Sequence, residues 1–267
     1  MNDFLKLRLQ TNQRLLALLI GLAMVGVHLL KVYSLSVKQH VAFTPYTTWL
    51  SMDFSGTSAL MLLFYLLLPI IASLSASTIF LEDKRNHLIC YGLLNFSRKK
   101  YFSMLFLKTF LTGAVVVALP LIIDLIGCFL LLPNLKPDPL INVNLGIYEG
   151  SGDLFPHLFY AHPLIYALVN IAISFVFAGL FVTFALAASF YIKNKMVILL
   201  LPFCLQLLSI AVNSFVLKNV AFSPFGFLPE AITTYDKSFL AMLLYGLILF
   251  LITLFLYVRG VKKNEAF

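Results

Sequence analysis

The chain has 267 residues, of which 61% are hydrophobic and only 11% are charged. A soluble domain has about 25% charged residues, so this chain has too few charges to cover a water-facing surface, and a soluble globular protein is excluded. The net charge of +8 does not indicate nucleic-acid binding, because the basic residues form no patch with room to fold into a soluble binding domain. The composition is that of an integral membrane protein.

Six apolar runs are long enough to cross a membrane as helices, which takes about 20 residues. They are rich in Leu, Ile, Val and Phe on every face, which suits lipid or a bundle interior rather than an amphipathic soluble helix. We therefore predict an all-α polytopic membrane protein with a single transmembrane domain. Its spans are predicted at residues 15–35, 58–80, 102–132, 163–192, 196–217 and 239–258.

The distribution of basic residues predicts the orientation of these spans, since lysine and arginine are enriched on the cytoplasmic side. With the N-terminus inside, fourteen of the nineteen lysines and arginines fall on inner segments and five on outer ones. We therefore expect both termini in the cytoplasm. Residues 81–101 are then an inner loop, and residues 133–162 are the largest outer loop.

Aromatic residues and prolines characterise the other segments. Tyr46 and Trp49 lie in the first outer segment, where aromatic side chains suit the headgroup level of the membrane. Pro69 is predicted to kink the second span and to free a carbonyl, which either a neighbouring helix or the nearby Ser and Thr side chains can satisfy. The last outer segment, residues 218–237, contains two prolines and a glycine, which predict a broken or re-entrant element.

Asp124 is the one carboxylate inside a predicted span. An intramembrane carboxylate is costly and by default suggests function. Because Asp124 lies near the outer third of its helix, two interpretations stay open. It is either a partly hydrated residue bonded to a neighbouring helix, or part of a substrate path. His28 is the other titratable residue well inside a span.

The inner loop 81–101 is the longest charged interruption between two apolar runs. Its mixture of charges and a short apolar patch is typical of an amphipathic helix that docks in a groove of a soluble partner. The alternative is a solvated basic loop that serves only topology. The candidate docking residues are Glu82, Asp83, Arg85, Leu88, Tyr91, Leu94, Ser97 and Arg98.

Several motifs of catalysis and nucleotide binding do not occur in the sequence. It contains no G-x-x-x-x-G-K-[ST] segment for a phosphate-binding loop and no H-E-x-x-H zinc motif. It also has no serine in a G-x-S-x-G context. The outer residues His157, His162, Glu149 and Asp153 match no metal-ligand spacing. We therefore predict no catalytic, cofactor or metal site, and any energy for transport must come from a partner.

The inner loop also has a recognisable order of residues. An acidic residue is followed by paired leucines, Ser-Arg, an aromatic residue and a lysine, here Glu82 or Asp83, Leu93-Leu94, Ser97-Arg98, Tyr101 and Lys108. A Ser-Pro-Phe element, residues 223–225, precedes the last span. Together these features resemble the permease subunit of ABC-2-type transporters. The sequence departs from that family at Asn86-His87 and Asn95, where the family often has Gly-Thr and Pro.

The resemblance implies the six-helix, type V exporter-like architecture of ABC-2 permeases, in a dimer with an identical or related second permease subunit. It implies that two copies of a separate ATPase hold ATP and Mg and dock on the inner loop as on a coupling helix. The chain itself would be a non-enzymatic subunit in a bacterial cell membrane. The implied activity is export of an amphipathic or hydrophobic substrate, such as a peptide, an antimicrobial peptide, a lipid or a drug.

Two other functions stay open. One is a membrane scaffold or sensor that transports nothing. The other is an intramembrane enzyme that uses Asp124, His28 and the outer histidines.

Overall fold

The computed structural model describes residues 11–37, 43–53, 59–86, 89, 97–141, 147, 153–230 and 235–263. Regular structure in these residues is helical, apart from an isolated β-bridge between Val220 and Asp236. Six helices are long and apolar enough to cross a membrane. The prediction of an all-α protein with six candidate spans is therefore confirmed.

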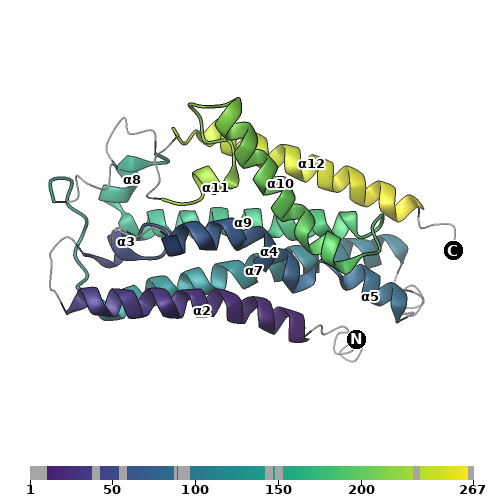
Figure 1. Cartoon of the computed structure of the whole chain (residues 1–267), viewed down its shortest axis with the longest axis horizontal. Coiled ribbons are helices and arrows are strands. Elements are labelled where there is room, and N and C mark those ends of the chain that lie inside the picture. The colour runs from purple at the N-terminus through teal and green to yellow at the C-terminus, as the bar shows by residue number, and fades with distance from the viewer. Residues whose placement is uncertain are drawn as a thin grey trace.

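The candidate spans follow the predicted order along the chain. They are α2 (Thr11–Ser36), α4 (Ala59–Ala76) with its continuation α5 (Ile79–Arg85), α7 (Arg98–Leu131), α9 (Pro163–Ala188), α10 (Lys195–Phe215) and α12 (Phe239–Lys263). The short helices α3 (Pro45–Thr48), α8 (Pro156–Ala161) and α11 (Pro224–Phe227) connect them at one end of the bundle (Figure 1).

Helix α9 is the most enclosed span. In its most apolar stretch 78% of the residues are buried, against 28% in α10 and 22% in α12. It packs against α7, α12 and α4, and its small residues allow close approach. A Cβ atom at Gly179 would collide with Phe110 of α7, and one at Gly113 of α7 would collide with Val182 of α9. Two helices can approach this closely only where such side chains are missing.

Pro69 lies inside α4, where it cannot donate a hydrogen bond to the carbonyl of Tyr65 four residues earlier. Gln206 of α10 supplies the missing donor, because its Nε2 donates to the Tyr65 carbonyl oxygen at 3.0 Å. Of the two predicted alternatives, it is thus a neighbouring span that satisfies the free carbonyl. The same hydrogen bond joins α4 to α10.

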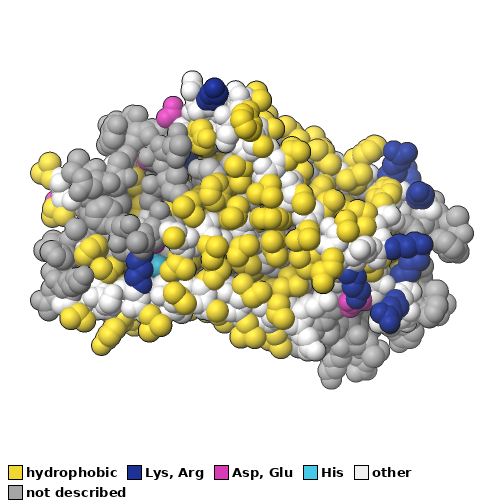
Figure 2. All heavy atoms as spheres, viewed as in Figure 1, with side chains coloured by type: hydrophobic (Ala, Val, Ile, Leu, Met, Phe, Trp, Pro, Cys, Tyr) yellow, Lys and Arg dark blue, Asp and Glu magenta, His cyan; other side chains and the backbone are white. Residues whose placement is uncertain are grey.

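The two ends of the bundle differ in charge. The start of α2, the end of α12 and helix α5 lie at one end, where lysines and arginines gather (Figures 1 and 2). We call this the basic end. The opposite end carries α3, α8 and α11, and we call residues 43–53, 153–161 and 218–238 the outer cap. A cytoplasmic location of the basic end, and of both termini, stays a prediction.

Candidate functional site

The predicted docking residues lie at the basic end, at the foot of two spans. Glu82, Asp83 and Arg85 belong to α5, Ser97 precedes α7, and Arg98 is the first residue of α7. Helices therefore extend into both ends of the predicted inner loop. Leu88, Tyr91 and Leu94 lie outside the described residues.

Polar contacts tie α5 to neighbouring spans. Tyr101 of α7 donates its hydroxyl to Asp83 Oδ2 at 2.8 Å, and Asp83 is only 2% exposed. Lys195 of α10 lies 2.8 Å from Glu82 Oε1 in a more exposed ion pair. A buried hydrogen bond to a charged group stabilises by about 1.5–3 kcal/mol, whereas an exposed ion pair contributes about 0–1 kcal/mol. The Tyr101–Asp83 hydrogen bond is therefore the stronger of these two contacts of α5.

Two more contacts join α7 to α12. Arg98 donates to the Val261 carbonyl oxygen at 3.0 Å, and Tyr257 donates to the Phe102 carbonyl oxygen at 2.7 Å. Three of the predicted docking residues, Glu82, Asp83 and Arg98, thus belong to one polar group that connects α5, α7, α10 and α12. A displacement of α5 would act on all of these spans.

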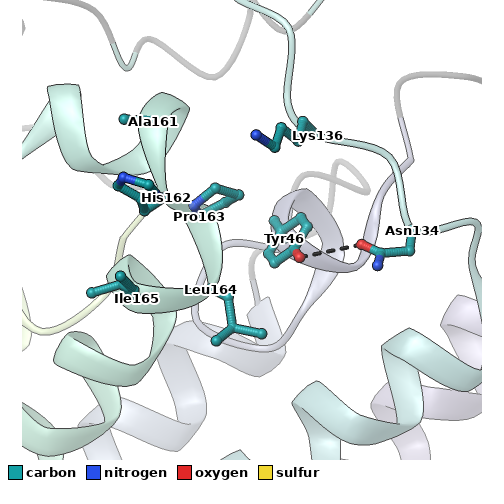
Figure 3. A pocket seen from close by; sticks show the side chains of 8 residues that line it. All are labelled: Tyr46, Asn134, Lys136, Ala161, His162, Pro163, Leu164 and Ile165. Carbon is teal, nitrogen blue, oxygen red and sulfur yellow. Dashed lines mark hydrogen bonds between the residues drawn. The ribbon is translucent and has the colours of Figure 1, made fainter.

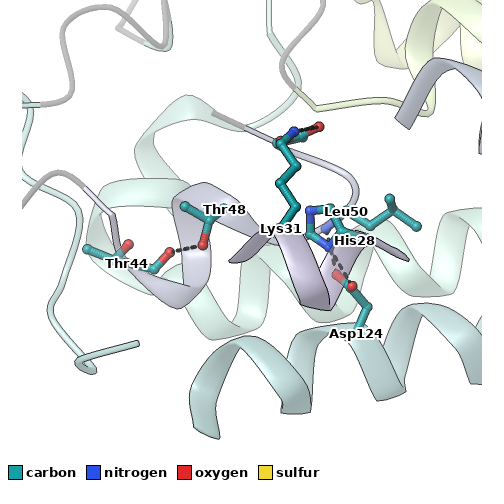
Figure 4. Close-up of polar contacts among 7 residues, drawn as sticks. His28, Lys31, Thr44, Thr48, Leu50 and Asp124 are labelled. Carbon is teal, nitrogen blue, oxygen red and sulfur yellow. Dashed lines mark hydrogen bonds and ion pairs between the residues drawn. The ribbon is translucent and has the colours of Figure 1, made fainter. Parts of the chain in front are cut away.

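Asp124 lies near the other end of α7 and is 0% exposed. Its Oδ1 is 2.6 Å from His28 Nδ1 of α2, and its Oδ2 accepts a hydrogen bond from the Leu50 backbone amide, also at 2.6 Å (Figure 4). The predicted bond to a neighbouring helix is present. The predicted partial hydration is wrong, because residues 43–53 fold over the helix end and bring the Leu50 amide to the carboxylate.

Cys128 lies one turn after Asp124, and the potential ligand atoms of Cys128, His28 and Asp124 lie within 4.8 Å of one another. Nitrogen, oxygen and sulfur atoms of this kind are ligands that zinc prefers. However, both Asp124 oxygens already have partners within the protein. All three side chains are also fully buried, so a substrate cannot reach them in this conformation. A structural hydrogen-bonded pair accounts for the arrangement, and we assign no metal or catalytic role to it.

The outer cap contains a second buried polar cluster, which we call the Glu230 cluster: Trp49, Asp153, Glu230 and Lys237. Trp49 Nε1 donates to Glu230 Oε2 at 3.1 Å. Lys237 Nζ lies 2.8 Å from Asp153 Oδ1 and donates to the Glu230 carbonyl oxygen at 2.6 Å. The Glu230 amide donates to the Ser51 carbonyl oxygen at 2.9 Å. All three segments of the outer cap meet in this cluster.

Burial dominates the electrostatics of Glu230, which is 2% exposed. Removal from water raises the pKa of its carboxyl group to about 8, although Lys237 and the hydrogen-bond contacts with Trp49 and Asn170 act in the opposite direction. Asp153 adds to the rise as a second negative charge. An acid in such an environment holds its proton at neutral pH.

No motif in the sequence predicts the Glu230 cluster. Trp49 and Tyr46 are expected at the headgroup level from their position in the chain, but Trp49 is 1% exposed and packs inside the cap. Trp49 and Glu230 are 181 positions apart in the chain, so no local pattern links them. The only available signal was the presence of three charged residues, Asp153, Glu230 and Lys237, among apolar and aromatic neighbours in outer segments.

Two of the hollows on the described surface lie beside the cap and along the spans. A small one of about 310 Å³ at the capped end is bordered by Lys136, His162 and Tyr46, whose hydroxyl donates to Asn134 Oδ1 at 3.2 Å (Figure 3). A larger one of about 780 Å³ lies between α9 and α12 and is lined by apolar side chains such as Phe177 and Leu247. The larger hollow has a size and lining that suit an acyl chain or another apolar molecule.

No protein family, curated protein or solved structure matches the chain.

Proposed function

We propose that the chain is the permease subunit of an ATP-binding cassette transporter in a bacterial cell membrane. Two copies of a separate ATPase drive it, and it pairs with an identical or related second permease subunit. The six candidate spans and the missing phosphate-binding loop support this proposal. The observation that carries it is the buried Tyr101–Asp83 contact, which links the foot of the predicted docking segment to α7.

Helix α7 provides a path from one end of the bundle to the other. Its 34 residues span about 50 Å at 1.5 Å per residue, more than the roughly 30 Å of the hydrocarbon core. Tyr101 lies near its first turn and Asp124 near its last turns. A push on α5 by the ATPase therefore acts, through α7, beneath the outer cap.

The nature of the transported molecule is proposed from the apolar surface. The hollow between α9 and α12 is lined almost wholly by apolar side chains, which fits the hydrophobic portion of an amphipathic peptide, a lipid or a drug. We propose that such a molecule leaves the inner leaflet along this face and is exported.

The proposal is tested by purifying the tagged chain from its native membrane in mild detergent. We expect an ATPase of the cassette type to co-purify, and its ATP hydrolysis in nanodiscs to exceed that of the isolated ATPase. Absence of any nucleotide-hydrolysing partner would overturn the proposal.

A pair of matched substitutions then tests the Tyr101–Asp83 hydrogen bond, on which the proposal depends. Tyr101→Phe removes only the hydroxyl that Asp83 accepts, and we expect the ATPase still to bind while its stimulation falls several-fold. Tyr191→Phe removes a hydroxyl at the same end, which donates to the Leu256 carbonyl oxygen in an exposed position, and we expect it to behave like the unmodified protein. Equal behaviour of the two variants would show that Tyr101 transmits nothing.

A further inference from the structure

We propose that Glu230 is a proton-binding site that holds the outer cap closed, and that loss of this proton releases the cap. The inference concerns the capped end alone, so it stands or falls independently of the proposed ATPase.

The hydrogen bonds of Glu230 fit a protonated carboxyl group. Oε2 accepts from Trp49, whereas Oε1 is buried and makes no hydrogen bond to the described residues. The Asn170 side chain lies next to the carboxyl group. Asn170 Nδ2 donates to the Tyr166 carbonyl oxygen at 3.3 Å, and its contact with Glu230 favours the ionised carboxylate rather than the proton. Oε1 nevertheless lacks a hydrogen bond to the described residues, and an ionised, buried oxygen without such a bond is costly.

The charges around Glu230 also favour a neutral carboxyl group. Among the described residues, it faces Lys237 from the segment before α12 and Asp153 from the segment before α8. It also faces the hydroxyl groups of Tyr166 from α9 and Tyr65 from α4. Lys237 forms its ion pair with Asp153. Because the ammonium group of Lys237 is paired with Asp153, an ionised Glu230 would be a buried charge without an ion pair of its own among the described residues, which is expensive.

The position of Glu230 converts its protonation state into an effect on the cap. Its amide donates to the Ser51 carbonyl oxygen, and its carboxyl group accepts from Trp49 of the same segment. Its carbonyl oxygen accepts from Lys237, which forms the ion pair with Asp153. An added negative charge here is relieved when water enters, and water enters when these segments separate. Glu230 is thus the residue at which a proton affects all three cap segments together.

Trp49 reports directly on this site, because it is the only tryptophan in the chain and its indole donates to the Glu230 carboxyl group. We would measure its fluorescence and its quenching by neutral acrylamide in nanodiscs from pH 6 to 9.5. The expected result is one titration of the emission, with quenching rising at least twofold on its alkaline side. Glu230→Gln, which stays neutral, should abolish the titration and keep quenching low. A flat profile for the unmodified protein, or the same titration in the variant, would overturn the proposal.

Two further variants decide the matter should Glu230→Gln fold poorly, as judged by its helical circular dichroism. Lys237→Gln removes the cation and should shift the midpoint of the titration to higher pH. Asp153→Asn removes the competing carboxylate and should shift it to lower pH. Asp138→Asn, which changes an acidic residue in the exposed segment after α7, should leave the midpoint unchanged. Shifts in the same direction for Lys237→Gln and Asp153→Asn, or no shifts, would contradict the proposal.

Discussion

At the scale of single residues, Asp124 shows how a buried carboxylate can be structural. His28 and the Leu50 amide both bond to it without access to water. Asp124→Ala leaves both of these groups without this acceptor, and a buried polar group left unsatisfied costs about 1–3 kcal/mol. We expect a marked loss of thermal stability in detergent, followed by helical circular dichroism. Asp124→Asn keeps an acceptor for Leu50 and should lose less.

A double substitution separates a structural role from a functional one. In His28→Leu/Asp124→Leu the two side chains of the pair are both apolar, and replacing a buried pair in this way is often neutral or stabilising. The Leu50 amide still loses its acceptor, so we expect this variant to recover part of the stability that Asp124→Ala loses. If the double variant is stable but transports nothing, Asp124 belongs to the substrate path after all.

Glu230 predicts a pH dependence of stability that can be measured separately from opening of the cap. Its pKa is 4.5 in the unfolded chain and about 8 in the folded protein, so the folded protein binds the proton more tightly. The resulting stability is fully present below pH 4.5 and is lost as the pH rises to about 8, by at most about 1.4 kcal/mol per pH unit. The melting temperature of the unmodified protein should therefore fall across this range relative to that of Glu230→Gln. Parallel curves would contradict this assignment.

At the scale of elements, the crossing of α7 and α9 depends on glycine. Gly113→Ala places a methyl group against Val182, and overpacking of this kind costs about 1–3 kcal/mol. We expect a lower melting temperature, which Gly113→Ala/Val182→Ala should partly restore by making room. Gly26→Ala serves as the control, because nothing lies within 4 Å of the added methyl group, and it should be neutral or slightly stabilising. Equal losses at Gly113 and Gly26 would argue against tight packing at the crossing.

The spans could be predicted from the sequence because hydropathy is a local property of each segment. The partners of polar groups could not. The sequence predicts that Pro69 frees a carbonyl and leaves open whether a neighbouring helix or nearby Ser and Thr side chains satisfy it; in the structure, Gln206 on α10 does so. The Glu230 cluster likewise combines residues from three distant segments. Such contacts depend on how the helices pack, which apolar runs of similar composition do not specify.

At the scale of the whole molecule, the charge difference between the two ends predicts the orientation. Because basic residues favour the cytoplasmic side, the basic end should face the cytoplasm and the outer cap the outside. Single cysteines at Lys193 and Lys136, in a chain with Cys90, Cys128 and Cys204 replaced, test this prediction in intact cells. A membrane-impermeant maleimide should label Lys136→Cys directly, but Lys193→Cys only after the membrane is permeabilised. The reverse pattern would place the Tyr101–Asp83 contact outside the cell, where a cytoplasmic ATPase could not act on it, and both the orientation and the proposed function would then fail together.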